Sequence, residues 1–179
     1  MKKAALLAVV VLLAGTFASA QTTGTPVALK AIIPSYIGFT GPNVSTVTFD
    51  FTNLGLNVAT GLPITKLASA LPTWTLMYNL DGTKNVTVCA YASALTGVGS
   101  NTIPASSLYG QPVGGSATNP FTGTDCGQAN SMLLDTIGSA TSNPGKTEGF
   151  SGMFLQTPNG TVVHPDTYNG TLNIIAMVQ

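Results

Sequence analysis

The chain has little charge of either sign. Of its 179 residues only 7% are charged: six lysines, no arginine and six acidic residues. A protein that binds nucleic acid needs clustered positive charge to displace counterions from phosphates. Apart from Lys2 and Lys3, the lysines of this chain occur singly, so the composition excludes nucleic acid as a partner.

The residues that usually carry catalysis are also scarce. His164 is the sole histidine, and Ser151 lies in a Gly-Phe-Ser-Gly run that lacks the second glycine of a nucleophile elbow. The six carboxylates show neither local pairing nor the alternating aspartates of a calcium loop. We therefore predict a non-enzymatic protein with no catalytic residue, metal site or cofactor, and a secreted hydrolase is the less favoured class.

The N-terminus has the three regions of a secretory signal. Two lysines precede an apolar run from Ala4 to Ala14, and Ala18 and Ala20 supply the small side chains of a cleavage site. The run is shorter than the roughly 20 residues that span a bilayer. Residues 1–20 are predicted to be a signal peptide and residues 21–179 a single exported domain, with no transmembrane segment after signal removal. The predicted location is extracellular, cell-surface or periplasmic.

Cys89 and Cys126 are the only cysteines. In an exported chain an even cysteine count favours a disulfide over a metal pair or a redox motif. Two free buried thiols are the alternative, because the sequence does not show whether the two Cα atoms come within bonding range.

Alternation of apolar and polar residues is the dominant pattern of the mature chain and predicts β-strands. Trp74 and Tyr78 share a strand face with leucines and are interpreted as core residues in preference to a sugar-stacking platform. Four Asn-x-Ser/Thr matches are interpreted as chance, at Asn43, Asn85, Asn159 and Asn169. The predicted elements are a strand at 44–53, a hairpin at 73–92 turning at Asp81-Gly82, a strand at 150–155, a return strand beginning at 161–164 and a final strand within 168–179. Further candidates are 27–33, 103–108 and 132–137, the last as a strand or a helical turn.

Glycine, proline, serine and threonine are concentrated in two stretches, 109–130 and 139–149, which are predicted to be long surface loops. About seven to nine short strands joined by such connections indicate an all-β, antiparallel sandwich or barrel.

The run from Pro165 to Ile174 (PDTYNGTLNI) resembles the final-strand signature of exported bacterial immunoglobulin-like sandwiches, namely chaperone-usher pilins and spore-coat-U-like secreted domains. The resemblance implies an immunoglobulin-like Greek-key β-sandwich, in which Tyr168 pins the corner before the last strand. It also implies the role of a surface fibre or coat subunit. The chain departs from the pilins because its cysteines lie mid-chain and Val178, instead of an aromatic residue, is penultimate.

Two functions follow as hypotheses. The first is a structural or adhesive surface protein that assembles with itself by strand addition. The inserted side chains would be Val27, Leu29, Ala31 and Ile33, and the accepting strand would present Leu172, Ile174, Ala176 and Val178. The alternative is a monomeric secreted module that binds a surface protein or glycan through its two long loops.

Overall fold

The computed structural model describes residue 28 and residues 30–52, 62–160 and 163–179, without the side chains of residues 141 and 142. The chain divides into two units, residues 1–33 and 34–179. In the first unit, the described residues 28 and 30–33 form no strand, and Ile32 and Ile33 are each 78% exposed. Val27 and Leu29 lie outside the described residues.

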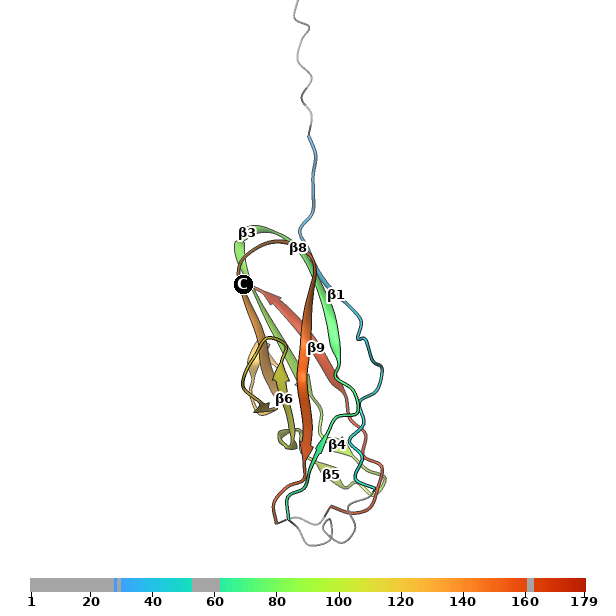
Figure 1. The fold of residues 1–179 in the computed structure, drawn as a ribbon. Coiled ribbons are helices and arrows are strands. Elements are labelled where there is room, and N and C mark those ends of the chain that lie inside the picture. The colour runs from blue at the N-terminus through green and yellow to red at the C-terminus, as the bar shows by residue number, and fades with distance from the viewer. Residues whose placement is uncertain (1–27, 29, 53–61, 161–162) are drawn as a thin grey trace, which may run out of the picture. The chain divides into compact units, whose positions relative to one another are not determined.

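The second unit is all-β and antiparallel, as predicted (Figure 1). Seven of its strands form one sheet in the order β1-β3-β8-β6-β7, with β9 also paired to β3 and β2 to β8, and β4 and β5 form a separate pair. The described elements are β1 (Tyr36–Thr40), β2 (Thr65–Leu67), β3 (Thr73–Ala92), β4 (Leu95–Thr96), β5 (Thr102–Ile103), the 3-10 turn η2 (Ala105–Ser107), β6 (Leu108–Pro112), β7 (Asn119–Pro120), the 3-10 turn η3 (Asp125–Gly127), β8 (Ser131–Gln156) and β9 (Leu172–Val178).

A ladder between two unusually long strands, β3 and β8, organises the sheet. The two strands bend together, because Asn79 pairs with Ser142 while the next pair is Lys84 with Ala140. Within the bend, the Asp81 carboxylate accepts hydrogen bonds from the backbone N–H of Thr83 at 2.9 Å and from its hydroxyl at 2.6 Å. Figure 1 shows the β3 and β8 ribbons curving over side by side at this point.

The bend encloses one hydrophobic core. Trp74, Leu76 and Tyr78 on the first arm of β3 belong to the same buried cluster as Val86 and Val88 on the second arm. Alternate residues point to one face of a strand, so a sheet that folds over this face forms two layers around a shared core. The two arms of the ladder are thus the layers of a β-sandwich, and the prediction that Trp74 and Tyr78 are core residues is confirmed.

The structure corrects the predicted hairpin at 73–92. This segment is the single strand β3, and Asp81-Gly82 forms its bend instead of a reversal, with a φ of 80° at Gly82. The predicted loop at 139–149 is also wrong, because these residues belong to β8 and pair with β3. The predicted loop at 109–130 is interrupted by the short elements β6, β7 and η3.

Several shorter predictions are also revised. Residues 44–52 form no strand, yet Phe49 and Phe51 pack against the core as their alternation predicted. Residues 30–33 form no strand. Of the predicted return strand at 161–164, residues 163–164 form none and residues 161–162 lie outside the described residues. The segment 103–108 ends β5, passes through η2 and begins β6. The segment 132–137 is a strand within β8, and the predicted final strand is confirmed as β9.

Gly149 permits a close approach between β8 and the start of β3. Its φ is 134°, and a Cβ atom at this position would lie 2.5 Å from the carbonyl oxygen of Pro72. Only glycine adopts this conformation without strain. The same backbone oxygen accepts a hydrogen bond from the N–H of Phe150 at 3.2 Å.

Candidate functional site

The strand β9 holds four of the residues predicted to take part in strand addition. Leu172, Ile174 and Ala176 pack against the core, and Val178 is 41% exposed. The first three side chains therefore contribute to the stability of the domain itself. What β9 leaves free is its backbone edge, because the one strand paired with it among the described residues is β3.

The strands β9 and β1 follow one another along the same edge of β3. Val178 pairs with Val86 and Tyr36 pairs with Asn79, so the two strands run in the same direction on either side of the β3 bend. Neither strand contains a charged residue or a proline. Across the described part of the chain, neither has a partner strand on its outer side.

The opposite edge of the same ladder has a different composition. Over residues 132–147, β8 pairs with β3 and with no other described strand. This edge contains Asp135, Pro144 and Lys146. Charged residues and proline are the usual means by which natural sheets prevent pairing at a free edge. One side of the ladder is thus protected and the side formed by β9 and β1 is not.

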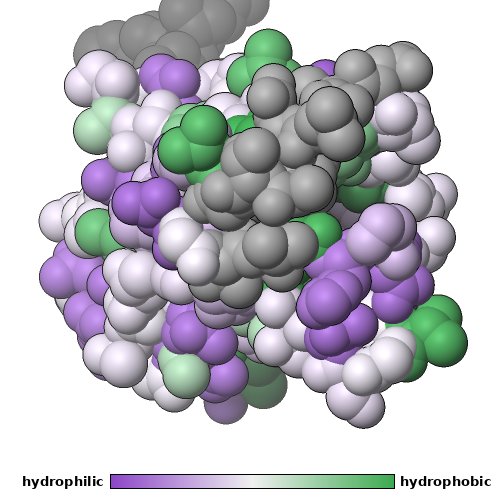
Figure 2. Space-filling model, turned by 90° about the horizontal axis from the view of Figure 1, so that it is seen from below, coloured by the Kyte–Doolittle hydropathy of each residue, from purple (hydrophilic) through white to green (hydrophobic). Residues whose placement is uncertain are grey.

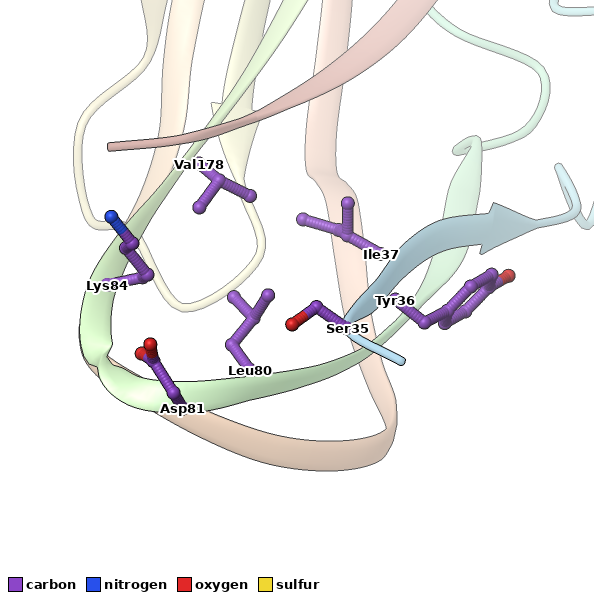
Figure 3. Close-up of a pocket in the computed structure, with 7 residues that line it drawn as sticks. All are labelled: Ser35, Tyr36, Ile37, Leu80, Asp81, Lys84 and Val178. Carbon is purple, nitrogen blue, oxygen red and sulfur yellow. The ribbon is translucent and has the colours of Figure 1, made fainter. Parts of the chain in front are cut away.

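A cleft of about 260 Å³ lies at the break between these two edge strands. Figure 3 shows Ile37 from β1, Leu80 from the β3 bend and Val178 from β9 pointing toward it, with Asp81 and Lys84 on the bend itself. The lining is mainly apolar. On the face of the molecule shown in Figure 2, by contrast, hydrophobic residues are spread among polar ones.

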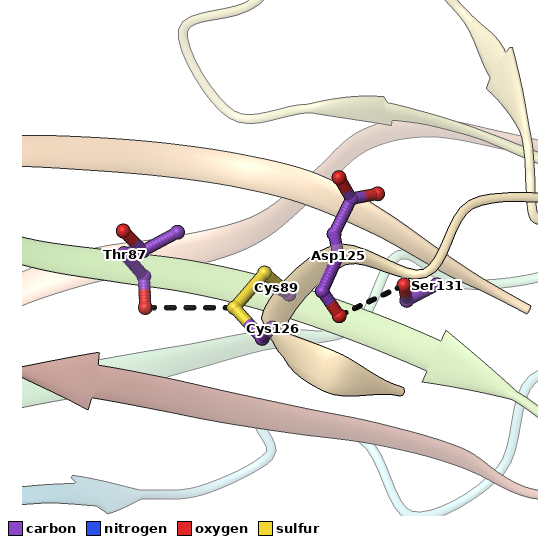
Figure 4. Close-up of a disulfide and its surroundings, with 5 residues drawn as sticks. All are labelled: Thr87, Cys89, Asp125, Cys126 and Ser131. Atoms are coloured by element: carbon purple, nitrogen blue, oxygen red, sulfur yellow. Dashed lines mark hydrogen bonds between the residues drawn. A yellow bond between two sulfur atoms is a disulfide. The ribbon is translucent and has the colours of Figure 1, made fainter. Parts of the chain in front are cut away.

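The two cysteines form a disulfide that fastens η3 to the sheet. Cys89 on β3 is completely buried, and its Sγ bonds to that of Cys126, with the two Cα atoms 6.1 Å apart. Figure 4 shows the bond beside the 3-10 turn, where the hydroxyl of Ser131 also donates to the carbonyl oxygen of Asp125 at 3.0 Å. The sequence left two alternatives open, a disulfide or two free thiols, and the structure contains the disulfide.

Tyr168 lies just before β9, where the resemblance places the corner. Its hydroxyl donates a hydrogen bond to the carbonyl oxygen of His164 at 3.0 Å, and its ring is half-buried against the core.

Two other residues considered in the sequence make hydrogen bonds to the backbone. The Ser151 hydroxyl donates to the carbonyl oxygen of Pro112 at 3.1 Å. Asn43, one of the possible glycosylation sites, bridges Leu71 and Thr73 through its side-chain amide.

Sequence reasoning missed a cluster of three charged residues on β8. Lys146 makes ion pairs with both Asp135 and Glu148, and the Lys146 Nζ lies 3.1 Å from the Glu148 Oε1. Asp135 belongs to the first arm of β8, and the other two residues belong to the second. Asp135 precedes Lys146 by 11 residues in the sequence, and the bend of β8 brings it to the other two groups. The only sequence signal is the spacing of Lys146 and Glu148, which places both on one strand face.

Burial controls the protonation of this cluster. Glu148 is 3% exposed, and this burial raises its pKa to about 7, because Lys146 only partly offsets the loss of water and Asp135 repels a second negative charge. Partial burial lowers the pKa of Lys146, but the hydrogen bonds and charges of Asp135 and Glu148 outweigh it, so this pKa lies above its ordinary value.

Neither a protein-family model nor a curated protein sequence matches the chain. Within the residues described, no three histidine, cysteine or acidic side chains gather closely enough to hold a metal ion. The same residues include no helix that is long and apolar enough to cross a membrane.

Proposed function

We propose that this protein is an exported, non-enzymatic surface subunit that assembles with copies of itself by strand addition. The observation that carries the proposal is the contrast between the two edges of the β3–β8 ladder. One edge carries charges and a proline, whereas the edge formed by β9 and β1 carries neither. An unprotected edge presents a row of unpaired backbone groups to a strand of another molecule.

The segment 27–33 of a neighbouring copy is the proposed donor. Its alternate apolar residues suit a strand with one face against a sheet, and its length matches that of β9. Ile33 is 78% exposed, so its apolar side chain has much surface to remove from water. Backbone hydrogen bonds would supply most of the affinity, and the alternate side chains would set the register.

Export to an oxidising compartment is the second part of the proposal. The leader-like N-terminus supports it, and the Cys89–Cys126 disulfide is compatible with it, because such bonds persist chiefly outside the cytosol. The loop-based binding module is less well supported, since one of its two proposed loops is part of β8.

The two adjacent isoleucines of the donor allow a matched test of the proposed assembly. Ile32 and Ile33 are equally exposed, but only Ile33 belongs to the alternate set that would face the neighbour. We expect Ile33→Asp to abolish the oligomers formed by the mature chain, measured by light scattering and electron microscopy, and Ile32→Asp to retain most of them.

Equal loss in both variants would indicate general hydrophobic association instead of strand insertion. A mature wild-type chain that remains monomeric at high concentration would contradict the proposal directly.

A further inference from the structure

The cluster of Asp135, Lys146 and Glu148 combines an amine, a carboxyl group in direct contact with it, and a second, buried carboxyl group. The Lys146 Nζ contacts the Asp135 Oδ2 and lies 3.1 Å from the Glu148 Oε1. The side chain of Glu148 is 3% exposed, whereas those of Lys146 and Asp135 are 36% and 29% exposed. The amine of Lys146 therefore lies between the partly exposed carboxyl group of Asp135 and the buried carboxyl group of Glu148.

An ordinary surface ion pair does not require a buried carboxyl group such as that of Glu148. A buried carboxylate loses its hydration and must recover the loss from hydrogen bonds and charges. Although Lys146 is near, the buried Glu148 Oε1 has no hydrogen bond of acceptable geometry among the described residues. In a chain with so few charged residues, a buried acid beside an amine–carboxyl contact indicates a chemical reaction at this site more than a contribution to the stability of the fold.

We propose that Lys146 and Asp135 condense to form an intramolecular amide (isopeptide) bond, with Glu148 as the catalytic proton carrier. Nucleophilic lysines and general acids both require partly dehydrated sites in which the reacting atoms are held in contact. The structure provides this contact through the bend of β8, which brings Asp135 on one arm to Lys146 on the other.

The reaction balances without any other reagent. Protonated Glu148 gives its proton to the Asp135 carboxylate and recovers one from the Lys146 ammonium, which leaves a neutral amine beside a neutral acid. The amine nitrogen attacks the Asp135 Cγ, a C–N bond forms, and the C–O bond to one carboxyl oxygen breaks. That oxygen leaves as one water molecule, which carries the proton of the acid and one proton from the nitrogen. The amide nitrogen keeps its other proton, and Glu148 ends protonated, as it began.

The product would join the two arms of β8 covalently across its bend. This bond is independent of the disulfide, which joins β3 to η3. It leaves β9 and β1 unchanged, whereas on the β8 edge it would replace the charges of Asp135 and Lys146 by a cross-link and leave Pro144 in place.

Trypsin digestion with mass spectrometry of the full mature chain tests the proposal. Beyond Lys84 the chain contains one more site, Lys146, and no arginine. Unmodified chain gives the fragments 85–146 and 147–179. If Lys146 is amidated, trypsin does not cleave after it. We expect a single fragment, 85–179, that is one water molecule lighter than its sequence after reduction of the disulfide.

Glu148→Gln and Lys146→Arg are the informative variants. Removing a general acid slows such a step by about 100-fold or more, so we expect Glu148→Gln to give a chain of full mass that trypsin cleaves after Lys146. Lys146→Arg should also have full mass, and Lys66→Arg serves as the control that keeps the bond. Folding of each variant is followed by circular dichroism.

Full mass and ready cleavage after Lys146 in the folded wild-type chain would overturn the proposal and leave an ion pair alone. The same water loss in folded Glu148→Gln would overturn the role of Glu148. Because these readouts are masses of a single chain, they do not depend on whether the protein assembles.

Discussion

At the scale of single residues, Glu148 has the most unusual environment. The sequence predicted none of it, because Asp135, Lys146 and Glu148 look like unrelated single charges until the bend of β8 brings them together. Trp74 and Tyr78, in contrast, were predicted correctly, since the face of a strand is set by local alternation alone. Residue-level sequence reasoning thus identifies the core more readily than a site assembled from distant segments.

The pKa of Glu148 predicts a pH dependence of stability. An acid whose pKa rises from 4.5 to about 7 on folding binds its proton more tightly in the folded chain. Its contribution is therefore complete below about pH 4.5 and is lost as the pH rises through 7, by at most about 3 kcal/mol. Urea unfolding of the wild type and Glu148→Gln across this range should show a decline in the free energy of unfolding of the wild type that the variant lacks.

The direction of this pH dependence is the same with or without the proposed amide, because burial of Glu148 is the main cause of its raised pKa. Parallel curves for the two proteins would contradict this assignment.

Gly149 and Gly160 form a matched pair for testing backbone strain. Both have positive φ, but a Cβ at Gly149 would lie 2.5 Å from the Pro72 oxygen, whereas nothing lies within 4 Å of one at Gly160. A strained φ alone costs about 1–3 kcal/mol. We expect Gly149→Ala to lower the free energy of unfolding by clearly more than Gly160→Ala in the same denaturation assay. Equal losses would show that the close approach to Pro72 does not limit this position.

At the scale of elements, the sequence predicts strand faces better than strand partners. Asp81-Gly82 is typical of a hairpin turn, but the aspartate and positive φ that suit a turn equally suit a bend shared by two long strands. The stretch 139–149 has the composition of a loop, yet β3 supplies the pairing that makes it a strand. Local composition does not reveal a partner that lies more than fifty residues away.

The disulfide is the element-scale contact whose removal is simplest to measure. Cys89 and Cys126 enclose a loop with a sequence separation of 37, which in the chain-entropy model corresponds to about 4 kcal/mol. Cys89→Ala with Cys126→Ala should lower the free energy of unfolding by about this amount in urea denaturation. Unchanged stability would mean that η3 does not depend on the bond.

The two edges of the ladder predict different responses to an added charge. Met177 on β9 and Leu133 on β8 are exposed apolar residues, 36% and 46% respectively. A lysine on an unprotected edge blocks the approach of another strand. We therefore expect Met177→Lys to suppress oligomers in size-exclusion chromatography, and Leu133→Lys to leave them in place. Suppression by Leu133→Lys alone would assign assembly to the opposite edge.

At the scale of the whole molecule, the protein has a β-sandwich with one open sheet edge, and an N-terminal segment precedes the sandwich in the chain. The all-β class was predictable, since alternation, glycine-rich connections and the absence of long helical patterns all favour it. The arrangement of the layers was not, because it depends on one long ladder folding over a common core. The open edge became apparent only when β9 and β1 were found on the same side of β3.

Sedimentation velocity of residues 21–179 beside residues 34–179, over a wide range of concentration, shows whether the N-terminal segment drives assembly. The second chain keeps every described strand and lacks the proposed donor. We predict larger species that increase with concentration for residues 21–179, and a folded monomer at every concentration for residues 34–179. Identical behaviour of the two chains, whether both are monomeric or both assemble, would contradict assembly through the N-terminal segment.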